Sequence, residues 1–460
     1  MFGLGAAGAF TAACATSPGA DLSTSMSDMS FQHGVASGDA TSTSVILWSR
    51  ATPTVDEKAV SALCLVTRDA DALGGADLSL DDPFSGLKLD RVIPTDTGPA
   101  RDFTLKVDAG AGKEGKLKAN TAYFYAFAVK TPKGWRMSPV GRTTTLPKSG
   151  TAPFSAAVVS CSNLPFGYFN AYEALAKDER VQAVIHLGDY FYEYGRDGYG
   201  GEVGAQLGRE VEPAHEVVTL KDYRRRHAQY KSDAQLQAAH ANKPWYCAWD
   251  DHESTNNSYR TGAENHQPDL EGEWSVRKAA AIQAYLEWMP VRDPAPGMEA
   301  GSIYRAFEIG DLASLFMLES RLLGRSDELS YAAALSVPED QQQAKVMEIV
   351  QEAMSPERTM LGAVQEAWLG GELKRSREEG KRWQVLGNQI IMAKVRAPNL
   401  VSIMSEDEKE ALYKQAPWAK RCIEFSQFGL PLNLDAWDGF VAARERLYAD
   451  AKAADANLVT

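Results

Sequence analysis

The sequence predicts an all-β N-terminal domain followed by an α/β domain. Short segments rich in aromatic and β-branched residues, separated by turn residues, fill the first third of the chain. A stretch rich in Thr, Pro, Gly and Ser at 143–155 then indicates a linker. After it, apolar strand patterns alternate with amphipathic helix patterns, which is typical of α/β domains. The length of 460 residues also favours two domains.

Residues 1–29 precede the expected domains and resemble part of an export signal followed by a spacer. The chain is apolar and rich in small residues up to Ala13, and Ser, Thr and Asp dominate the residues that follow. This pattern is typical of the apolar region of a signal peptide, with Ala13-Cys14-Ala15 as a cleavage site, although no basic segment precedes it. Cys14 leaves a lipid anchor as an alternative. We therefore expect an exported protein, periplasmic or extracellular, without a membrane-spanning helix in its mature form.

The N-terminal domain is expected over residues 30–148. The segment 43–50 is a short apolar strand, and the segment 121–130 places aromatic residues at alternate positions on one face. Turn-rich pieces lie between them, and no long helix pattern interrupts them. Short strands with frequent turns predict a β-sandwich of immunoglobulin-like type.

The α/β domain is expected over residues 153–460. Its strand patterns and its helix patterns alternate along the chain, and the helices bury one apolar face each. The predicted strands are 154–160, 181–188, 245–250 and 382–393. The predicted helices are 170–179, 273–288 and 363–381. The basic segment 223–230 is expected to be a solvated helix face, with a contact to phosphate as the alternative. His215, His227 and His240 are expected at the surface.

Charge and cysteine content exclude several classes of protein. The net charge of −13 provides no basic surplus for nucleic acid, although it does not exclude a small phosphate ester held through a bound cation. The five cysteines are odd in number and widely spaced, with no CxxC pair, which argues against a structural zinc site and against a disulfide framework. The sequence also contains no P-loop, no GxGxxG after a strand and no GxSxG motif.

Residues with metal-ligand chemistry follow three of the predicted strands. Cys161 follows the first, Asp189 and Tyr192 follow the second, and the third is followed by the run Asp251-His252 and by Asn256. Ligands gather outside the carboxyl ends of strands in open α/β sheets, so these side chains are expected to meet. Taken singly, each also has a structural interpretation as a buried thiol, a turn carboxylate, a packing aromatic or a surface loop.

The chemistry of these side chains points to a metal centre. A thiolate, a carboxylate and a phenolate together suit trivalent iron better than zinc alone. A carboxylate such as Asp189 can also bridge two cations. His252 is suited to protonating a leaving oxygen near neutral pH.

At these residues the sequence resembles the alkaline phosphatase D (PhoD-like) family of metallophosphoesterases. The resemblance is carried, in order along most of the chain, by FQHGVASGDATSTSVILWSRATP, SCSNLPFGYFNAY, IHLGDYFYEYG, WDDHESTNN, GAVQEAWL, LGNQIIMA and DAWDGF. It implies an N-terminal β-sandwich followed by a four-layer α/β/β/α metallophosphoesterase domain. It also implies secretion, usually by the twin-arginine (Tat) route.

The resemblance implies hydrolysis of phosphomonoesters by a metal-bound hydroxide, with phosphodiesters, including phospholipids, as the alternative substrates. The implied cofactors are ferric iron and calcium. By motif, Cys161, Asp189 and Tyr192 would hold the iron, and Asp189 would bridge to calcium. Asp251 or Asn256 would bind the second metal, and His252 would donate a proton or contact phosphate.

Two departures from the family pattern stand out. Glu319 occupies a position where the family usually has Asp, which keeps the charge but moves it by one methylene group. The Gly-Asp-x-His segment that supplies further metal ligands in the family does not occur before Thr460. We therefore expect a metallophosphoesterase domain that lacks its C-terminal part, and an inactive relative that acts as a binding module remains an alternative.

Overall fold

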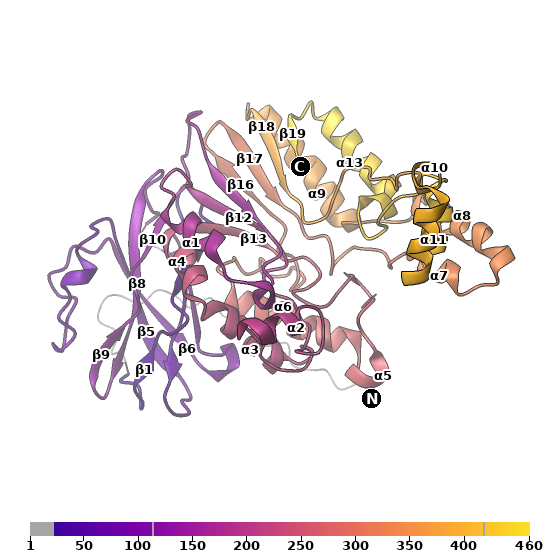
Figure 1. The fold of residues 1–460 in the computed structure, drawn as a ribbon. Coiled ribbons are helices and arrows are strands. Elements are labelled where there is room, and N and C mark those ends of the chain that lie inside the picture. The colour runs from indigo at the N-terminus through magenta and orange to yellow at the C-terminus, as the bar shows by residue number, and fades with distance from the viewer. Residues whose placement is uncertain (1–22, 113–114, 417–418) are drawn as a thin grey trace, which may run out of the picture.

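The computed structural model describes residues 23–112, 115–416 and 419–460. The described chain starts in a β-rich region, coloured indigo in Figure 1, and ends beside α13. The expected signal segment, with Cys14 and its cleavage site, lies outside the described residues, so its prediction stays a prediction. No helix in the described ranges is both long enough and apolar enough to cross a membrane.

A five-stranded antiparallel sheet forms most of the N-terminal region. Its order is β10-β8-β5-β6, and β9 pairs with β8. The strands are β5 (Val60–Thr67), β6 (Arg91–Thr97), β8 (Ala122–Thr131), β9 (Gly134–Met137) and β10 (Gly141–Thr144). The predicted alternation in β8 is confirmed, because Tyr123, Tyr125 and Phe127 enter the main core while Ala126 and Ala128 face a smaller cluster on the other side.

A second sheet has six strands and joins the N-terminal region to the rest of the molecule. Its order is β11-β12-β13-β2-β3-β7. The strands are β2 (Val35–Gly38), β3 (Ile46–Arg50), β7 (Thr104–Asp108), β11 (Ala156–Val159), β12 (Ala183–Leu187) and β13 (Pro244–Ala248). The β-rich character of residues 30–148 is confirmed, whereas the immunoglobulin-like sandwich stays a prediction. Because β2 pairs in parallel with β13, this second sheet continues into the α/β region.

Both faces of this six-stranded sheet are buried. In β13, Trp245 and Cys247 pack against helices, whereas Tyr246 and Ala248 face the main core. The helices that contribute to this packing are α1 (Asn170–Lys177), α3 (Leu220–Lys231), α4 (Ala234–Asn242) and α6 (Trp274–Trp288). Continuous apolar strands covered on both faces are typical of parallel sheets.

A four-stranded sheet packs on the other face of the six-stranded sheet. Its order is β16-β17-β18-β19, with β16 (Arg305–Ile309), β17 (Ala313–Met317), β18 (Trp383–Gly387) and β19 (Leu458–Val459). One of its faces shares the main core, and the other packs against α9 (Gly362–Glu378) and α13 (Val441–Ala453). The order of layers is therefore helices, sheet, sheet, helices, as expected for an α/β/β/α fold (Figure 1).

The remaining helices lie around these layers. Helices α2 (Gly201–Leu207) and α5 (Pro268–Glu271) lie in the long connections after β12 and β13. A group of helices projects from one side of the molecule in Figure 1 and comprises α7 (Ala332–Leu335), α8 (Gln342–Ala353), α10 (Leu400–Ile403), α11 (Glu406–Gln415) and α12 (Ala419–Ser426). The short strands are β1 (Met29–Ser30), β4 (Thr52–Pro53), β14 (Ser258–Tyr259) and β15 (Gly262–Ala263).

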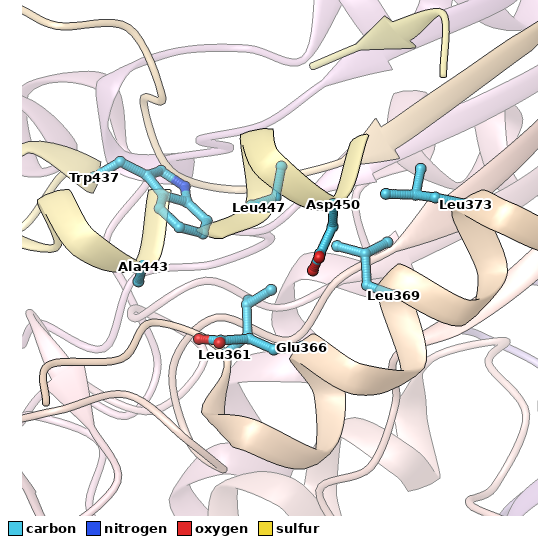
Figure 2. A pocket seen from close by; sticks show the side chains of 8 residues that line it. All are labelled: Leu361, Glu366, Leu369, Leu373, Trp437, Ala443, Leu447 and Asp450. Carbon is cyan, nitrogen blue, oxygen red and sulfur yellow. The ribbon is translucent and has the colours of Figure 1, made fainter. Parts of the chain in front are cut away.

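A small cavity lies between α9 and α13, as Figure 2 shows, with Leu369, Trp437 and Leu447 among its lining residues. Its volume of ≈ 10 Å³ is at the lower limit for a single water molecule. The leucine and tryptophan side chains around it belong to the core that covers the four-stranded sheet. It is therefore a packing void and not a binding site.

The predicted surface positions of two histidines are wrong. His227 and His240 are buried, and the neighbouring Arg226 is buried as well. The basic segment in α3 is therefore only partly solvated, because Arg225 is exposed whereas Tyr223, Arg226 and His227 are buried. His215 is exposed, as expected.

Candidate metal centre

The loops that follow β11 and β12 are joined to each other directly beyond their strands. The two strands run in parallel, and beyond them Cys161 N donates to Gly188 O at 3.2 Å and Ser162 N donates to Asp189 O at 2.7 Å. Cys161 and Asp189 both adopt positive φ, at 57° and 54°. Non-glycine residues rarely occupy this region, and they persist where surrounding contacts fix them. These contacts place Cys161 beside Asp189.

Gly188 allows this close approach. It has φ +94°, and a Cβ at this position would lie 2.3 Å from Asp250 N and 2.5 Å from Asp250 Cβ. Only glycine fits a position that combines a positive φ with backbone contact at this distance. The loop after β12 can therefore pack against the loop after β13, which carries Asp251 and His252.

Asp189 is the buried centre of the site. Its Oδ2 accepts the Cys161 thiol at 3.4 Å and the Tyr192 hydroxyl at 3.1 Å. Its Oδ1 is buried and has no hydrogen-bond partner among the described residues. Burial, together with the nearby Asp251, raises the pKa of Asp189 to about 7. The carboxylate is therefore poorly stabilised by its protein neighbours alone.

Asp251 and His252 complete a compact group around Asp189. All three side chains are buried, and each offers a ligand atom within 4.8 Å of the others. Asp251 Oδ2 accepts the Asn257 backbone N–H at 2.7 Å, which fixes its orientation. Carboxylate oxygens and an imidazole nitrogen at these separations are the donor types of a protein metal site.

Glu193 holds the His252 ring. The His252 Nδ1 lies 2.7 Å from Glu193 Oε2, and Glu193 is fully buried. The other carboxylate oxygen accepts the Asn256 backbone N–H at 2.8 Å and the Thr255 hydroxyl at 3.0 Å. This contact occupies Nδ1 and leaves Nε2 as the other nitrogen of the His252 ring.

The carboxylates around His252 also favour its charged form. Burial opposes the imidazolium, but Asp251 and Glu193 outweigh this effect and raise the pKa of His252 to about 10. The Tyr192 ring lies against the imidazole with centroids 4.2 Å apart. Glu193 thus holds one edge of the His252 ring, and Tyr192 packs against its face.

Glu253 connects the loops after β12 and β13. It is buried, and it accepts the backbone N–H groups of Asp189 at 3.0 Å, Tyr190 at 2.6 Å and Asp250 at 2.8 Å. Hydrogen bonds from N–H groups to a carboxylate are among the stronger ones in proteins. Glu253 therefore positions the backbone that carries Asp189.

Two buried arginines balance the acidic side chains behind the site. Arg321 donates to Asp250 at 2.6 Å and pairs with both oxygens of Asp435 at 2.7 and 2.8 Å. Its Nη2 also lies 3.7 Å from Asp251 Oδ1. Arg325 forms a further ion pair with Asp435 at 2.5 Å. Asp435 thus links the segment before α13 to the two arginines that lie behind the site.

Five of the six predicted site residues come together: Cys161, Asp189, Tyr192, Asp251 and His252. Asn256 lies on the adjoining loop, where its side-chain amide donates to Glu264 at 2.9 Å. Its role as a ligand stays a prediction. Glu319 lies outside this group, because its oxygens accept the Trp249 indole N–H at 2.8 Å and three backbone N–H groups of residues 321–323.

Sequence reasoning missed the residues that orient the ligands. Glu193 lies in the same segment after the strand as Asp189 and Tyr192, so its proximity to the site could have been predicted from its position. Glu253 stands next to His252 in the same way. Asp435 opens the DAWDGF motif, but nothing in the sequence indicated its pairing with Arg321, which lies 114 residues away.

The fold and the site together define a class: a four-layer α/β/β/α protein with a candidate metal centre at the strand ends of one sheet. Two family models match the chain, PhoD-like phosphatase over residues 156–460 and PhoD-like phosphatase, N-terminal domain, over residues 13–147. The chain belongs to the PhoD-like phosphatase family.

Individual relatives agree with this assignment. The chain is 34% identical to alkaline phosphatase D of Bacillus subtilis (strain 168) over 444 residues, which cover 93% of this chain and 63% of that relative. A solved structure described as the structure of PhoD matches with a TM-score of 0.70 and 32% identity, over 93% of this chain and 70% of the other. The chain thus spans less than two thirds of the length of alkaline phosphatase D.

Proposed function

We propose that this protein is an exported, metal-dependent phosphoric ester hydrolase of the alkaline phosphatase type that acts on phosphomonoesters. The observation that carries the proposal is the buried set of donor atoms around Asp189, with His252 beside it. Membership of the PhoD-like phosphatase family supports the same reaction class.

The donor set fits a highly charged cation. Asp189 Oδ1 is buried without a hydrogen-bond partner among the described residues, and burial together with Asp251 raises the pKa of this carboxyl group despite the nearby His252. Burial raises the pKa of Cys161 and of Tyr192, so neither side chain would ionise near neutral pH without a cation beside it. We propose that Cys161, Asp189 and Tyr192 hold ferric iron, and that Asp189 also binds calcium together with Asp251 or Asn256. Such cations, when bound, neutralise phosphate charge and lower the pKa of an attacking water.

The protein side chains have separate tasks in this reaction. The His252 Nε2 donates a proton to the leaving oxygen as the phosphorus–oxygen ester bond breaks, and it recovers a proton from the water that adds to phosphorus. Glu193 keeps the imidazole in the required orientation through its contact with Nδ1. Glu253 and Arg321 hold the loops that carry the carboxylates.

The test is metal analysis and hydrolysis of p-nitrophenyl phosphate by the purified chain and by Asp189→Asn. Loss of the shared ligand is expected to lower kcat by about a thousandfold or more and to reduce bound iron and calcium together. Asp56→Asn, an exposed carboxylate in the N-terminal region, is the matched control and should retain both. A variant that kept full activity and metal content without Asp189 would contradict the proposal.

The same assay separates the two substrate classes. A bis-p-nitrophenyl ester hydrolysed faster than the monoester would favour the phosphodiesterase alternative.

Fractionation of cells that express the chain with residues 1–29 tests export. Retention of the unprocessed protein in the cytoplasm would contradict it.

A further inference from the structure

A series of aromatic rings leads from the candidate metal centre to the protein surface. The Tyr192 ring lies 4.2 Å from that of His252, the Tyr199 ring lies 6.2 Å from that of Tyr192, and the Phe166 ring lies 4.9 Å from that of Tyr199. The two outer residues are exposed in part, Tyr199 to 60% and Phe166 to 45%. A contiguous exposed apolar surface next to a site is typical of a binding surface.

An open cavity adjoins these rings. Its volume is ≈ 640 Å³, within the usual range of ligand sites. Tyr194 forms part of its wall and also contacts the site, because its ring lies 5.6 Å from that of His252 and 5.9 Å from that of Tyr199. Tyr194 therefore connects the wall of the cavity with both His252 and Tyr199.

The charges of the cavity do not favour a second phosphate. Asp197 and Glu216 line it. Its arginine, Arg196, is already in ion pairs with Glu210 and Glu212. The other basic side chain of the lining, His215, lies 3.2 Å from Asp222. An anionic group would therefore meet no unpaired cation among the lining residues, whereas an uncharged ring would meet the Tyr194 ring.

We propose that Tyr194, Tyr199 and Phe166 form a leaving-group subsite for planar aromatic groups, such as aryl or nucleoside groups without a second phosphate. The inference rests on the proposed function, because the leaving group is that of the ester hydrolysed beside Asp189. A ring bound here stacks on Tyr199 while its ester oxygen lies next to His252. Stacking on aromatic side chains tolerates different ring systems. The subsite therefore favours planar leaving groups and distinguishes little between one ring system and another.

The kinetic test compares phenyl phosphate with ethyl phosphate. Tyr199→Ala is expected to lower kcat/KM for phenyl phosphate by about tenfold and to leave that for ethyl phosphate nearly unchanged. Tyr199→Phe, which keeps the ring, should resemble the wild type. The matched control is Tyr168→Ala, because Tyr168 is similarly exposed but stacks on Arg209 at 5.0 Å, outside the ring series.

A binding measurement separates this inference from the proposed function. Calorimetry should show that the metal-loaded chain binds phenylphosphonate about tenfold more tightly than methylphosphonate and that Tyr199→Ala removes the difference. If the chain prefers phenylphosphonate but hydrolyses neither phenyl phosphate nor ethyl phosphate, the proposed function is overturned and the subsite is supported. Equal losses on both substrates, or equal binding of the two phosphonates by the wild type, would overturn the subsite.

Discussion

Lys231 is a buried cation beside the strand that carries the site. Its ammonium lies 3.1 Å from His240 Nε2 and above the rings of Trp48 and Tyr190 at 4.8 and 5.3 Å. No carboxylate among the described residues forms an ion pair with it. Burial lowers the pKa of Lys231 to about 7. The aromatic rings compensate only part of the cost of removing this charge from water.

This shift predicts how stability depends on pH. Between about pH 7 and the ordinary lysine pKa of about 10.4, the unfolded chain binds the proton of Lys231 and the folded chain does not. The free energy of unfolding should therefore rise as the pH rises from 7 to 9. Lys231→Met should be more stable than the wild type at pH 7 by about 1 to 3 kcal/mol, and it should lose this rise.

Urea unfolding at pH 7, 8 and 9 measures both effects. Lys221→Met is the control, since Lys221 is exposed on the same helix, α3. Equal pH slopes in the wild type and in Lys231→Met would show that the buried amine does not titrate in this range.

At the scale of secondary-structure elements, the site depends on how closely the loops after β12 and β13 pack. Gly188→Ala would place a methyl group against the backbone of Asp250, at a residue with φ +94°. We expect a loss of about 3 kcal/mol, from steric overlap together with the left-handed conformation. Gly208→Ala, with φ +66°, ψ 28° and no atom near its Cβ, should lose only about 1 kcal/mol.

Comparison of these two variants separates the loop contact from the cost of a positive φ, because only Gly188→Ala meets the Asp250 backbone. Chemical unfolding provides the values. Metal content should fall in Gly188→Ala, because the displaced loop carries Asp189. Equal losses of stability in the two variants would show that the close contact between the loops after β12 and β13 contributes nothing to stability.

The site was predictable from the sequence where it follows strand ends. Cys161, Asp189 and Asp251 each come directly after an apolar strand, and parallel strands bring their carboxyl ends to one edge of a sheet. The pairing of Arg321 with Asp435 was not predictable, because any acidic residue could have filled that role. His227 and His240 were misplaced because their polar neighbours suggest solvent, while α6 and β13 in fact cover them.

At the scale of the whole molecule, Asp39 ties the N-terminal strands to both sheets of the α/β region. This buried carboxylate accepts two hydrogen bonds from Arg305, at 2.7 and 2.8 Å, and one from the Arg292 backbone at 2.7 Å. Arg305 also donates to Cys247 O at 2.7 Å. The ion pair therefore joins β2, β13 and β16.

Asp39→Ala should destabilise the protein by about 3 to 5 kcal/mol, because it leaves the Arg305 charge buried without its partner. Asp90→Ala removes the carboxylate of a partly exposed ion pair with Arg68 and should cost about 1 kcal/mol or less. Thermal unfolding followed by far-UV circular dichroism measures both. Near-equal shifts in Tm for the two variants would contradict a joining role for Asp39.

The pairing of β2 with β13 also sets an order on folding during synthesis. Ser37 and Gly38 find their strand partners only at Pro244 and Trp245. A growing chain must therefore emerge beyond this point, about half of its length, before the six-stranded sheet can close. The first 150 residues leave the ribosome with one edge of β2 still unsatisfied, and contacts between such distant segments are slow to form. The N-terminal region is thus completed by the part of the protein that is made after it.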